Sequence, residues 1–451
     1  MRWQGDETIE QINTMDTFKQ FVRSAGLAIG VILGLGLWMT IPYLVLGLGL
    51  IFIAWLLLSR TGNQVLAITL VGLSTLPQRI GATLVVIVGI AGVVGVLVAM
   101  LAMAAGFQAT LNRTGDDETA IALRAGANAE LSSGLDRNST TLIAQAPGVL
   151  HDARDRPITS AEVVVVANLP KRSTGTDANV EVRGVGPLIW ALRPNVKMIA
   201  GRRFDPGLRE LAVGKGALAQ FAGLDLGSTV RLNNQTWTVV GVFESGDAHD
   251  SELWGDSESV ASAYRRNVFQ SVTVRLTDST AFAQFKAALT GDPRLKVDVD
   301  TTRDYYSKQS EQLTKMIRVL GTGVAVIMAI GAVFGALNTM YAAVAARARE
   351  IATLRALGFS GGPVVISVLL EAMLLALVGG GLGAGIAYVV FNGYTVSTLG
   401  SNFSQVVFQF QVGPTLLLHG LQWSLAIGFL GGLFPALRAA NLPVTVALRE
   451  L

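Results

Sequence analysis

The stretch RAREIATLRALGFS, residues 347–360, places three arginines between two long apolar runs. Apolar residues recur in it at three-residue spacing and form a stripe along one side of a helix. The stripe consists of Ala348, Ile351, Leu354 and Leu357. Arg347, Glu350 and Arg355 lie off the stripe, and Gly358 is a natural helix stop. The pattern predicts a short amphipathic helix whose apolar side rests on a membrane or docks on a partner protein.

The composition predicts a membrane protein. Hydrophobic residues fill 51% of the 451 positions, charged residues fill only 15%, and the mean hydropathy is +0.49. These values are far from those of an average soluble domain. The net charge of +3 is too small for this length to indicate a nucleic-acid-binding protein. The sequence contains no cysteine, which excludes disulfides and thiolate metal sites.

Five apolar segments are long enough to cross a hydrocarbon core of roughly 30 Å at about 1.5 Å per helical residue. They are residues 25–58, 81–105, 315–346, 364–393 and 413–437. The first has the length of one oversized helix or of two short ones, and Pro42 lies near its middle. We expect a transmembrane hairpin there and single spans elsewhere. Residues 1–24 precede an apolar run far longer than that of a cleavable signal peptide and are expected to be retained.

Residues 106–314 are more polar and follow a different pattern. Three stretches are typical of strands: AEVVVVAN at 161–168, STVRLNNQTWTVVGVF at 228–243 and SVTVRL at 271–276. The second is expected to be a hairpin that turns at Asn233 and Asn234, and residues 280–289 are typical of a helix. The segment is therefore expected to be an α+β domain inserted into a bundle of membrane helices.

The distribution of arginines predicts the topology. Residues 347–360 and the tail 438–451 carry arginines, whereas residues 394–412 contain neither Lys nor Arg. The positive-inside rule places the first two segments in the cytoplasm and the third outside. Counting spans back places the α+β domain outside as well. An N-terminal hairpin would put residues 1–24 in the cytoplasm, and a single helix would put them outside.

Several motifs, in order, resemble the permease domain of the FtsX/MacB family of ABC transporters. They are REIATLRALGFS, the apolar segment with VLLEAMLLALVGGGLGAGIA, and the chain end GGLFPALRAANLPVTVALREL. Residues 180–204, 210–232 and 238–256 are similar to the MacB-like periplasmic domain. The resemblance runs from about residue 70 to the end, so the first apolar segment lies outside it.

The resemblance implies that residues 347–360 are a coupling helix that touches an ATPase. The implied coupling residues are Arg347, Arg349, Glu350, Ile351, Leu354, Arg355, Leu357 and Gly358. It also implies that two permease subunits pair, as a homodimer or a heterodimer, in the bacterial inner membrane. No G-x-x-x-x-G-K-[ST] loop occurs in the sequence, so ATP and Mg are expected on a separate ATPase subunit. We expect no directly bound cofactor.

The loop GDAHDSELWGD gathers side chains that suggest a metal site, although acid-rich loops are usually solvated. These residues are Asp247, His249, Asp250, Glu252 and Asp256. His151 and His419 are isolated, and with no cysteine neither a zinc hydrolase nor a Cys nucleophile can be assembled. We therefore predict neither a metal site nor an intrinsic enzyme activity.

Glu371 is the one clear acid within an apolar segment. Ionisable groups at such positions are costly and are paired or functional. Glu371 either bonds a neighbouring helix near the inner interface or helps to pack the region next to the coupling helix, which we favour. Three G-x-x-x-G pairs predict close helix packing, within the chain or across a dimer. They are Gly331 with Gly335, Gly379 with Gly383, and Gly381 with Gly385.

The segment from 303 to 347 contains no proline, so one helix on the order of 65 Å is expected there, about twice the membrane core. A rigid rod of this kind would transmit ATPase motion to the outside domain. Two functional classes follow from the resemblance. The complex exports periplasmic cargo, with an adaptor and an outer-membrane channel, or extracts lipoproteins; alternatively, it activates a periplasmic partner such as a cell-wall hydrolase. The large outside domain favours the first class.

Overall fold

The computed structural model describes residues 42–400 and 404–441, which fold into two compact units. Among the described residues, a helical unit contains 42–101, Leu320–Phe391 and 412–441. An α+β unit contains Ala102–Val319 and Asn392–Gln411. The protein is therefore a helical membrane bundle with an inserted α+β domain, as the sequence predicts.

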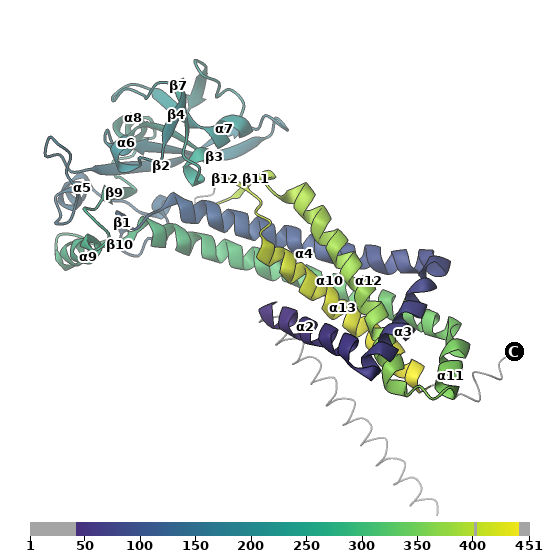
Figure 1. The fold of residues 1–451 in the computed structure, drawn as a ribbon. Helices are drawn as coiled ribbons and strands as arrows, with labels where there is room; N and C mark the ends of the chain where they lie inside the picture. Colours follow the sequence, from purple (N-terminus) through teal and green to yellow (C-terminus); the bar gives the residue numbers. More distant parts are fainter. Residues whose placement is uncertain (1–41, 401–403, 442–451) are drawn as a thin grey trace, which may run out of the picture. The chain divides into compact units, whose positions relative to one another are not determined.

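Four described helices are long and apolar enough to cross a membrane. They are α4 (Ile80–Thr114, preceded by the short η1, Leu76–Arg79), α10 (Thr302–Ala346), α12 (Gly361–Phe391) and α13 (Pro414–Ala440). α12 and α13 lie side by side (Figure 1). The 45 residues of α10 form one helix, about 68 Å long at 1.5 Å per residue, which confirms the long helix predicted from the absence of proline.

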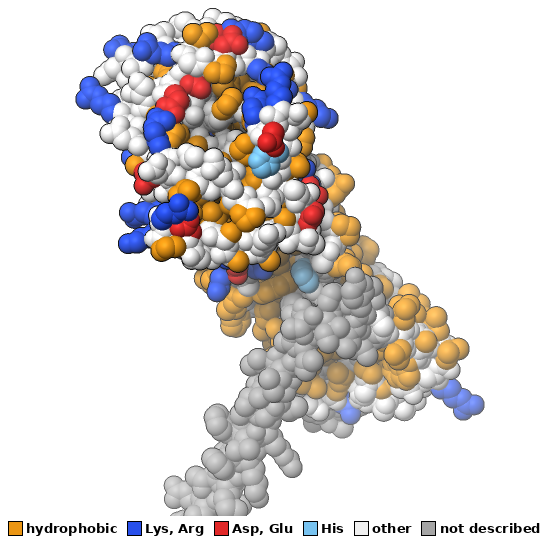
Figure 2. Space-filling view, turned by 90° about the vertical axis from the view of Figure 1, so that its left-hand side faces the viewer, with side chains coloured by type: hydrophobic (Ala, Val, Ile, Leu, Met, Phe, Trp, Pro, Cys, Tyr) orange, Lys and Arg blue, Asp and Glu red, His pale blue; other side chains and the backbone are white. Residues whose placement is uncertain are grey.

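The exposed side chains differ between the two units. Figure 2 shows apolar side chains over the helical unit, whereas charged side chains gather over the α+β unit. Ile327, Phe334 and Val389 are examples of large apolar residues exposed on the long helices. A continuous apolar surface of this kind marks contact with lipid or with another protein.

The first apolar segment is described only from Pro42 onward. There α2 (Pro42–Leu58) is followed by α3 (Arg60–Ser74), and the chain bends by 96° between Gly49–Leu58 and Arg60–Ser74. Ser59 caps α3, because its Oγ accepts a hydrogen bond of 2.8 Å from the Gly62 amide. By length and composition the bent pair is a candidate for one further, broken span or for a re-entrant loop.

Several predictions about the chain ends fall outside the described residues. These are the N-terminal segment 1–24, the part of the hairpin before Pro42, and the tail beyond Asn441. The hairpin and the cytoplasmic N-terminus therefore stay predictions.

The α+β unit is built on a mixed ten-stranded sheet with the order β10-β1-β9-β2-β3-β8-β5-β7-β4, and β6 pairs with β7. The strands are β1 (Thr119–Arg124), β2 (Thr159–Pro170), β3 (Asp177–Val185), β4 (Lys197–Gly201), β5 (Glu210–Gly214), β6 (Thr229–Leu232), β7 (Gln235–Glu244), β8 (Glu252–Asp256), β9 (Ser271–Arg275) and β10 (Val297–Thr301). Of the described pairs in this sheet, β3–β8 and β5–β7 are parallel and the others are antiparallel.

Strand β2 joins the two halves of this sheet, since its first residues pair with β9 and the rest pair with β3. Each half has its own apolar core. The helices that accompany the sheet are α5 (Arg137–Ala144), α6 (Ile189–Leu192), α7 (Lys215–Gln220), α8 (Ser257–Ala263) and α9 (Ala281–Gly291), with the 3₁₀ turns η2 (Glu130–Ser132) and η3 (Ala248–Ser251). The structure confirms the helix predicted at 280–289 and the turn between β6 and β7, where Asn233 and Asn234 have φ of 42° and 63°.

The connection between α12 and α13 is a two-stranded hairpin that belongs to the α+β unit. Its strands are β11 (Thr395–Leu399) and β12 (Gln405–Gln409). Ser404 Oγ donates to Glu181 Oε2 over 3.1 Å, and the Val407 amide donates to Ser251 Oγ over 2.8 Å. The hairpin is therefore fixed to β3 and to η3 by specific hydrogen bonds.

Candidate coupling helix and buried ion pairs

The amphipathic stretch forms the short helix α11 (Ala348–Ala356), which begins directly after α10. Gly358 ends it with φ of +96°, a conformation that favours glycine, and its amide donates to Arg355 O over 3.1 Å. Glu350 lies in the first turn and Arg355 in the last, so both charges complement the helix dipole. The predicted helix and its stop are confirmed.

Arg347, at the start of α11, is held by a buried carboxylate on α12. Its Nη1 donates to Glu371 Oε2 over 3.1 Å, and Arg79 Nη2 donates to the other carboxylate oxygen over 3.1 Å. Glu371 is only 2% exposed. One carboxylate thus pairs with two guanidinium groups, which offsets the cost of burying it.

Gly72 of α3 makes room for this ion pair. A Cβ atom at this position would lie 2.7 Å from Arg347 Nη1 and 2.8 Å from Glu371 Oε2. One turn earlier, Thr69 Oγ1 donates to Ser367 Oγ over 3.1 Å. α3, α11 and α12 therefore meet at one point. The contributions of Gly72 and Arg79 could not be predicted from the sequence, because each depends on partners that are distant in the chain.

The inner side of α11 is anchored at two further points. Ile351, 3% exposed, lies in an apolar cluster with residues of α10, α12 and α13. Arg355 Nη1 donates to the carbonyl of Ala440, at the end of α13, over 2.8 Å. α11 is therefore attached to three long helices of its own unit.

These contacts correct the predicted orientation of the apolar stripe. Ile351 faces the bundle instead of a membrane or a partner, Leu354 is half-buried, and Leu357 is 72% exposed. Arg347, expected at the docking surface, is buried in the ion pair with Glu371. Three-residue spacing identifies one side of a helix but does not say what covers it. The exposed part of the predicted coupling set consists of Arg349, Glu350, Leu357 and Gly358.

The glycine pairs in the spans have two different environments. A Cβ at Gly379 would lie 2.8 Å from the carbonyl oxygen of Ile87, and one at Gly383 would collide with that of Ala91. This pair lets α12 approach α4 closely. Gly331, Gly335, Gly381 and Gly385 have no described atom within 4 Å of a built Cβ, so they leave surface open to lipid or to a second subunit.

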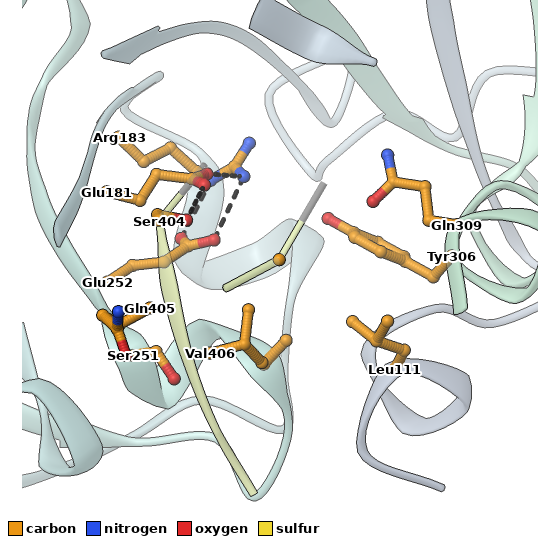
Figure 3. Close-up of a pocket in the computed structure, with 12 residues that line it drawn as sticks. Leu111, Glu181, Arg183, Ser251, Glu252, Tyr306, Gln309, Ser404, Gln405 and Val406 are labelled. Atoms are coloured by element: carbon orange, nitrogen blue, oxygen red, sulfur yellow. Dashed lines mark hydrogen bonds and ion pairs between the residues drawn. The ribbon is translucent and has the colours of Figure 1, made fainter. Parts of the chain in front are cut away.

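A second buried charge cluster lies in the α+β unit, around Arg183 of β3. Its guanidinium donates to four carboxylates at 2.5–2.9 Å. They belong to Glu130, Glu162, Glu181 and Glu252. Figure 3 shows Arg183 and Glu252 on one side of a cavity of about 40 Å³ and Tyr306 on the other. The cavity has room for water but not for a drug-sized molecule.

Sequence reasoning missed this cluster. Glu181 and Arg183 alternate with the apolar Val180 and Val182, a pattern that predicts one polar, solvent-facing side of β3. All four residues are buried. The only signal was the presence of opposite charges two residues apart on the same side of a strand.

Arg183 determines the protonation of its partners. Burial would raise the pKa of Glu130, but the charge and hydrogen bonds of Arg183 lower it below its ordinary value. Burial would also raise the pKa of Glu252, but the charges of Arg183 and His249 lower it to about 2. Both carboxyls are therefore ionised at neutral pH.

The acidic loop is folded and mostly buried, which corrects the expectation of a solvated loop. Asp247 Oδ1 lies 2.9 Å from His249 Nδ1. Burial would raise the pKa of Asp247, but its contacts, first of all with His249, lower it to about 2. Burial raises the pKa of Asp250. Glu252 pairs with Arg183, and Asp256 caps α8 by accepting from the Ser259 amide.

No metal-binding group of three or more suitable side chains occurs among the described residues. The other two histidines remain separate: His151 Nδ1 lies 3.1 Å from Val149 O, and His419 Nδ1 lies 2.9 Å from Gln422 Oε1.

Two family models match the chain. Residues 83–292 match the MacB-like periplasmic core domain, and residues 322–444 match the FtsX-like permease C-terminal domain. The first contains strands β1–β9 of the sheet and the Arg183 cluster, and the second contains α11 and its anchors.

Curated relatives that match this chain are longer than it is. The macrolide export ATP-binding/permease protein MacB of Shewanella sp. (strain ANA-3) is 24% identical over 381 residues, which cover 73% of this chain and 55% of that protein. MacB of Photorhabdus laumondii is 30% identical over 236 residues, which cover 50% of this chain and 35% of that protein. The chain thus spans about half the length, or less, of these relatives.

Solved structures of extracytoplasmic domains also match. The extracellular domain of the noncanonic ABC-type transporter YknZ is 16% identical and covers 41% of this chain and 98% of that one, with a TM-score of 0.31. The periplasmic region of MacB from Actinobacillus actinomycetemcomitans is 14% identical and covers 43% and 93%, with a TM-score of 0.32. Because both TM-scores are below 0.5, the family assignment rests on the two family models.

Proposed function

The chain belongs to the MacB/FtsX-like family of ABC transporter permeases, and on this premise we propose that it transmits the motion of an ABC ATPase across the bacterial inner membrane to its periplasmic domain. The observation that carries this proposal is the attachment of α11 to its own bundle. Arg347, Ile351 and Arg355 each bind a different neighbour. A displacement of α11 would therefore move the helices to which it is attached.

The continuity of α10 supports the same proposal. Ala346, its last residue, is separated from α11 by Arg347 alone, and its first residue, Thr302, directly follows strand β10. A single helix thus connects the coupling helix to the sheet of the periplasmic domain. The ion pair between Arg347 and Glu371 joins α11 to α12. Transmission of motion through such contacts needs no substrate path through the bundle.

We assign ATP binding to an ATPase outside these 451 residues, which contain no phosphate-binding G-x-x-x-x-G-K-[ST] loop. The relatives named above are macrolide export proteins, so we propose that the stroke drives export of periplasmic cargo, with an adaptor and an outer-membrane channel completing the route. Pairing of two permease subunits completes the proposed complex.

Leu357→Asp tests the coupling assignment. Leu357 is 72% exposed, so the substitution leaves the anchored side of α11 intact while placing a charge on the outer side. If an ATPase packs on Leu357, recovery of a coexpressed ABC ATPase with the variant should fall about tenfold or more below its recovery with the wild-type chain. Leu208→Asp is the matched control, because Leu208 is an exposed leucine of the α+β unit. Equal ATPase recovery with Leu357→Asp and with the control would contradict the assignment.

A further inference from the structure

A second cavity in the α+β unit, of about 230 Å³, is lined by arginine side chains from three separate elements. Arg113 comes from the last turn of α4, Arg193 follows α6, and Arg275 ends β9. Nothing in the proposed export mechanism uses this cavity. It is distinct from the small cavity beside Glu252, although Tyr306 lines both.

Two buried hydrogen-bond donors in the lining have no partner among the described residues. They are Nη1 of Arg193 and the hydroxyl of Thr273. Thr273 is only 1% exposed. Buried donors without acceptors destabilise a fold, and native proteins keep few of them. Both atoms belong to residues that line the cavity, and a ligand with acceptor oxygens would satisfy them.

The charges of the lining favour an anion. Among the described residues that line the cavity, three guanidinium groups face one carboxylate, Asp116. Its Oδ1 accepts from the Glu118 amide at 3.0 Å and from Thr119 Oγ1 at 2.8 Å, so part of this carboxylate is already occupied.

The existing ion pairs leave donors available. Arg193 binds Glu162 through Nη2 at 3.2 Å, which leaves Nη1 without a partner among the described residues. Arg275 Nη2 binds Glu118 over 2.8 Å, but the Glu118 side chain is 53% exposed, and such a pair is weak. Arg113 is exposed. Glu162 and Glu118 therefore reduce the positive charge of the site but leave hydrogen-bond donors available.

We propose that this cavity binds a phosphate group. Guanidinium groups match phosphate oxygens in geometry and charge, and a phosphate presents acceptors in more directions than a carboxylate does. The cavity is smaller than the 300–1,000 Å³ or so typical of sites for drug-sized ligands, so it fits a phosphate with a small substituent. The phosphate comes from a lipid head group or from a free phosphate.

Calorimetric titration of the full chain in a phosphate-free maltoside detergent tests the proposal. One arm uses inorganic phosphate, the other uses dihexanoyl phosphatidylglycerol below its micelle concentration, and chloride keeps the ionic strength equal. We expect saturable binding in at least one arm. Binding of the lipid alone identifies a head-group site, and binding of inorganic phosphate identifies a site open to free phosphate.

Two variants locate the binding. Thr273→Val keeps the shape of a side chain whose hydroxyl has no described partner, so it should leave folding intact and lower the affinity about tenfold. Arg113→Gln, on an exposed side chain, should do the same without risk to the core. Arg209→Gln makes the same charge change at an exposed position outside the lining and should bind like wild type. Absence of saturable binding in both arms, or unchanged affinity in Arg113→Gln and Thr273→Val, overturns the proposal.

Discussion

Arg347 and Glu371 stand 24 positions apart in the chain and meet over 3.1 Å, where they fasten the start of α11 to α12. Both side chains are nearly inaccessible to solvent, so the pair is isolated from competing water. If α11 moves as proposed, this contact is one of three through which the movement would reach the other helices.

Glu371→Gln should therefore destabilise the helical unit. Arg79 and Arg347 would lose their shared counter-charge, and breaking a buried pair by removing one partner typically costs about 3–5 kcal/mol. Glu350→Gln is the matched control: Glu350 also binds Arg347, but its side chain is 50% exposed, so the expected cost is about 0–1 kcal/mol. Thermal unfolding of the purified variants in detergent measures both, and similar midpoints for the two would refute the importance of burial.

Gly72→Ala should weaken the same ion pair by a steric route. The added methyl would lie within 3 Å of Arg347 and Glu371, which would have to move apart. Gly81→Ala in α4 meets no atom within 4 Å and should be neutral or slightly stabilising, since alanine favours helix by about 1 kcal/mol. The unfolding midpoint should fall for Gly72→Ala only; a rise in both variants would show that the ion pair tolerates the methyl group.

The two glycine pairs of α12 should respond differently to substitution. Gly383→Ala would push α12 away from Ala91 of α4, whereas Gly385→Ala points into open space. We expect the first to lower the thermal midpoint of the helical unit and the second to leave it unchanged or raise it. If Gly385→Ala is the more damaging variant, then that side of α12 is covered by a second subunit.

Acid should unfold the α+β unit through the Arg183 cluster. The pKa of Glu252 is about 2 in the folded protein against an ordinary 4.5, and that of Glu130 is also lowered. The unfolded chain therefore takes up protons first, so this stabilisation is complete above pH 4.5 and is lost as the pH falls from about 4.5 toward 2.

Near-UV circular dichroism from pH 7 to pH 2 measures this loss, and Trp254, whose Nε1 donates to Glu252 Oε2 over 2.7 Å, is a suitable reporter. Glu252→Gln should be less stable at neutral pH and show a shallower dependence on acid. Glu311→Gln, at an exposed position, should follow the wild-type curve. A Glu252→Gln curve that overlays wild type would remove this cluster as the origin of acid sensitivity.

Local signals were enough to predict several elements. The length of α10 follows from an apolar run without proline, and the β6–β7 turn follows from two adjacent asparagines between alternating strands. The stop at Gly358 follows from the preference of glycine for positive φ. Each of these depends on residues close together in the chain.

Long-range contacts could not be predicted in the same way. Arg183 finds its carboxylates 2 to 69 positions away, on η2, β2, β3 and β8, and no periodicity encodes that convergence. The outward orientation expected for Ile351 failed for a related reason, because a helical stripe looks the same whether its own bundle or a partner covers it. The acidic loop was expected to be solvated because nothing near it in the sequence indicates that Arg183, on another strand, pairs with Glu252.

The assignment of the β11–β12 hairpin to the α+β unit changes how that unit is tethered. The chain passes between the two units at four places, after Leu101, Val319, Phe391 and Gln411. A body joined by two tethers keeps a free axis of rotation through them, and additional tethers restrict it. The hairpin is held to this unit by the hydrogen bonds of Ser404 and Val407. A twist of α12 against α13 would therefore exert a torque on the sheet, in addition to any force along the long helices.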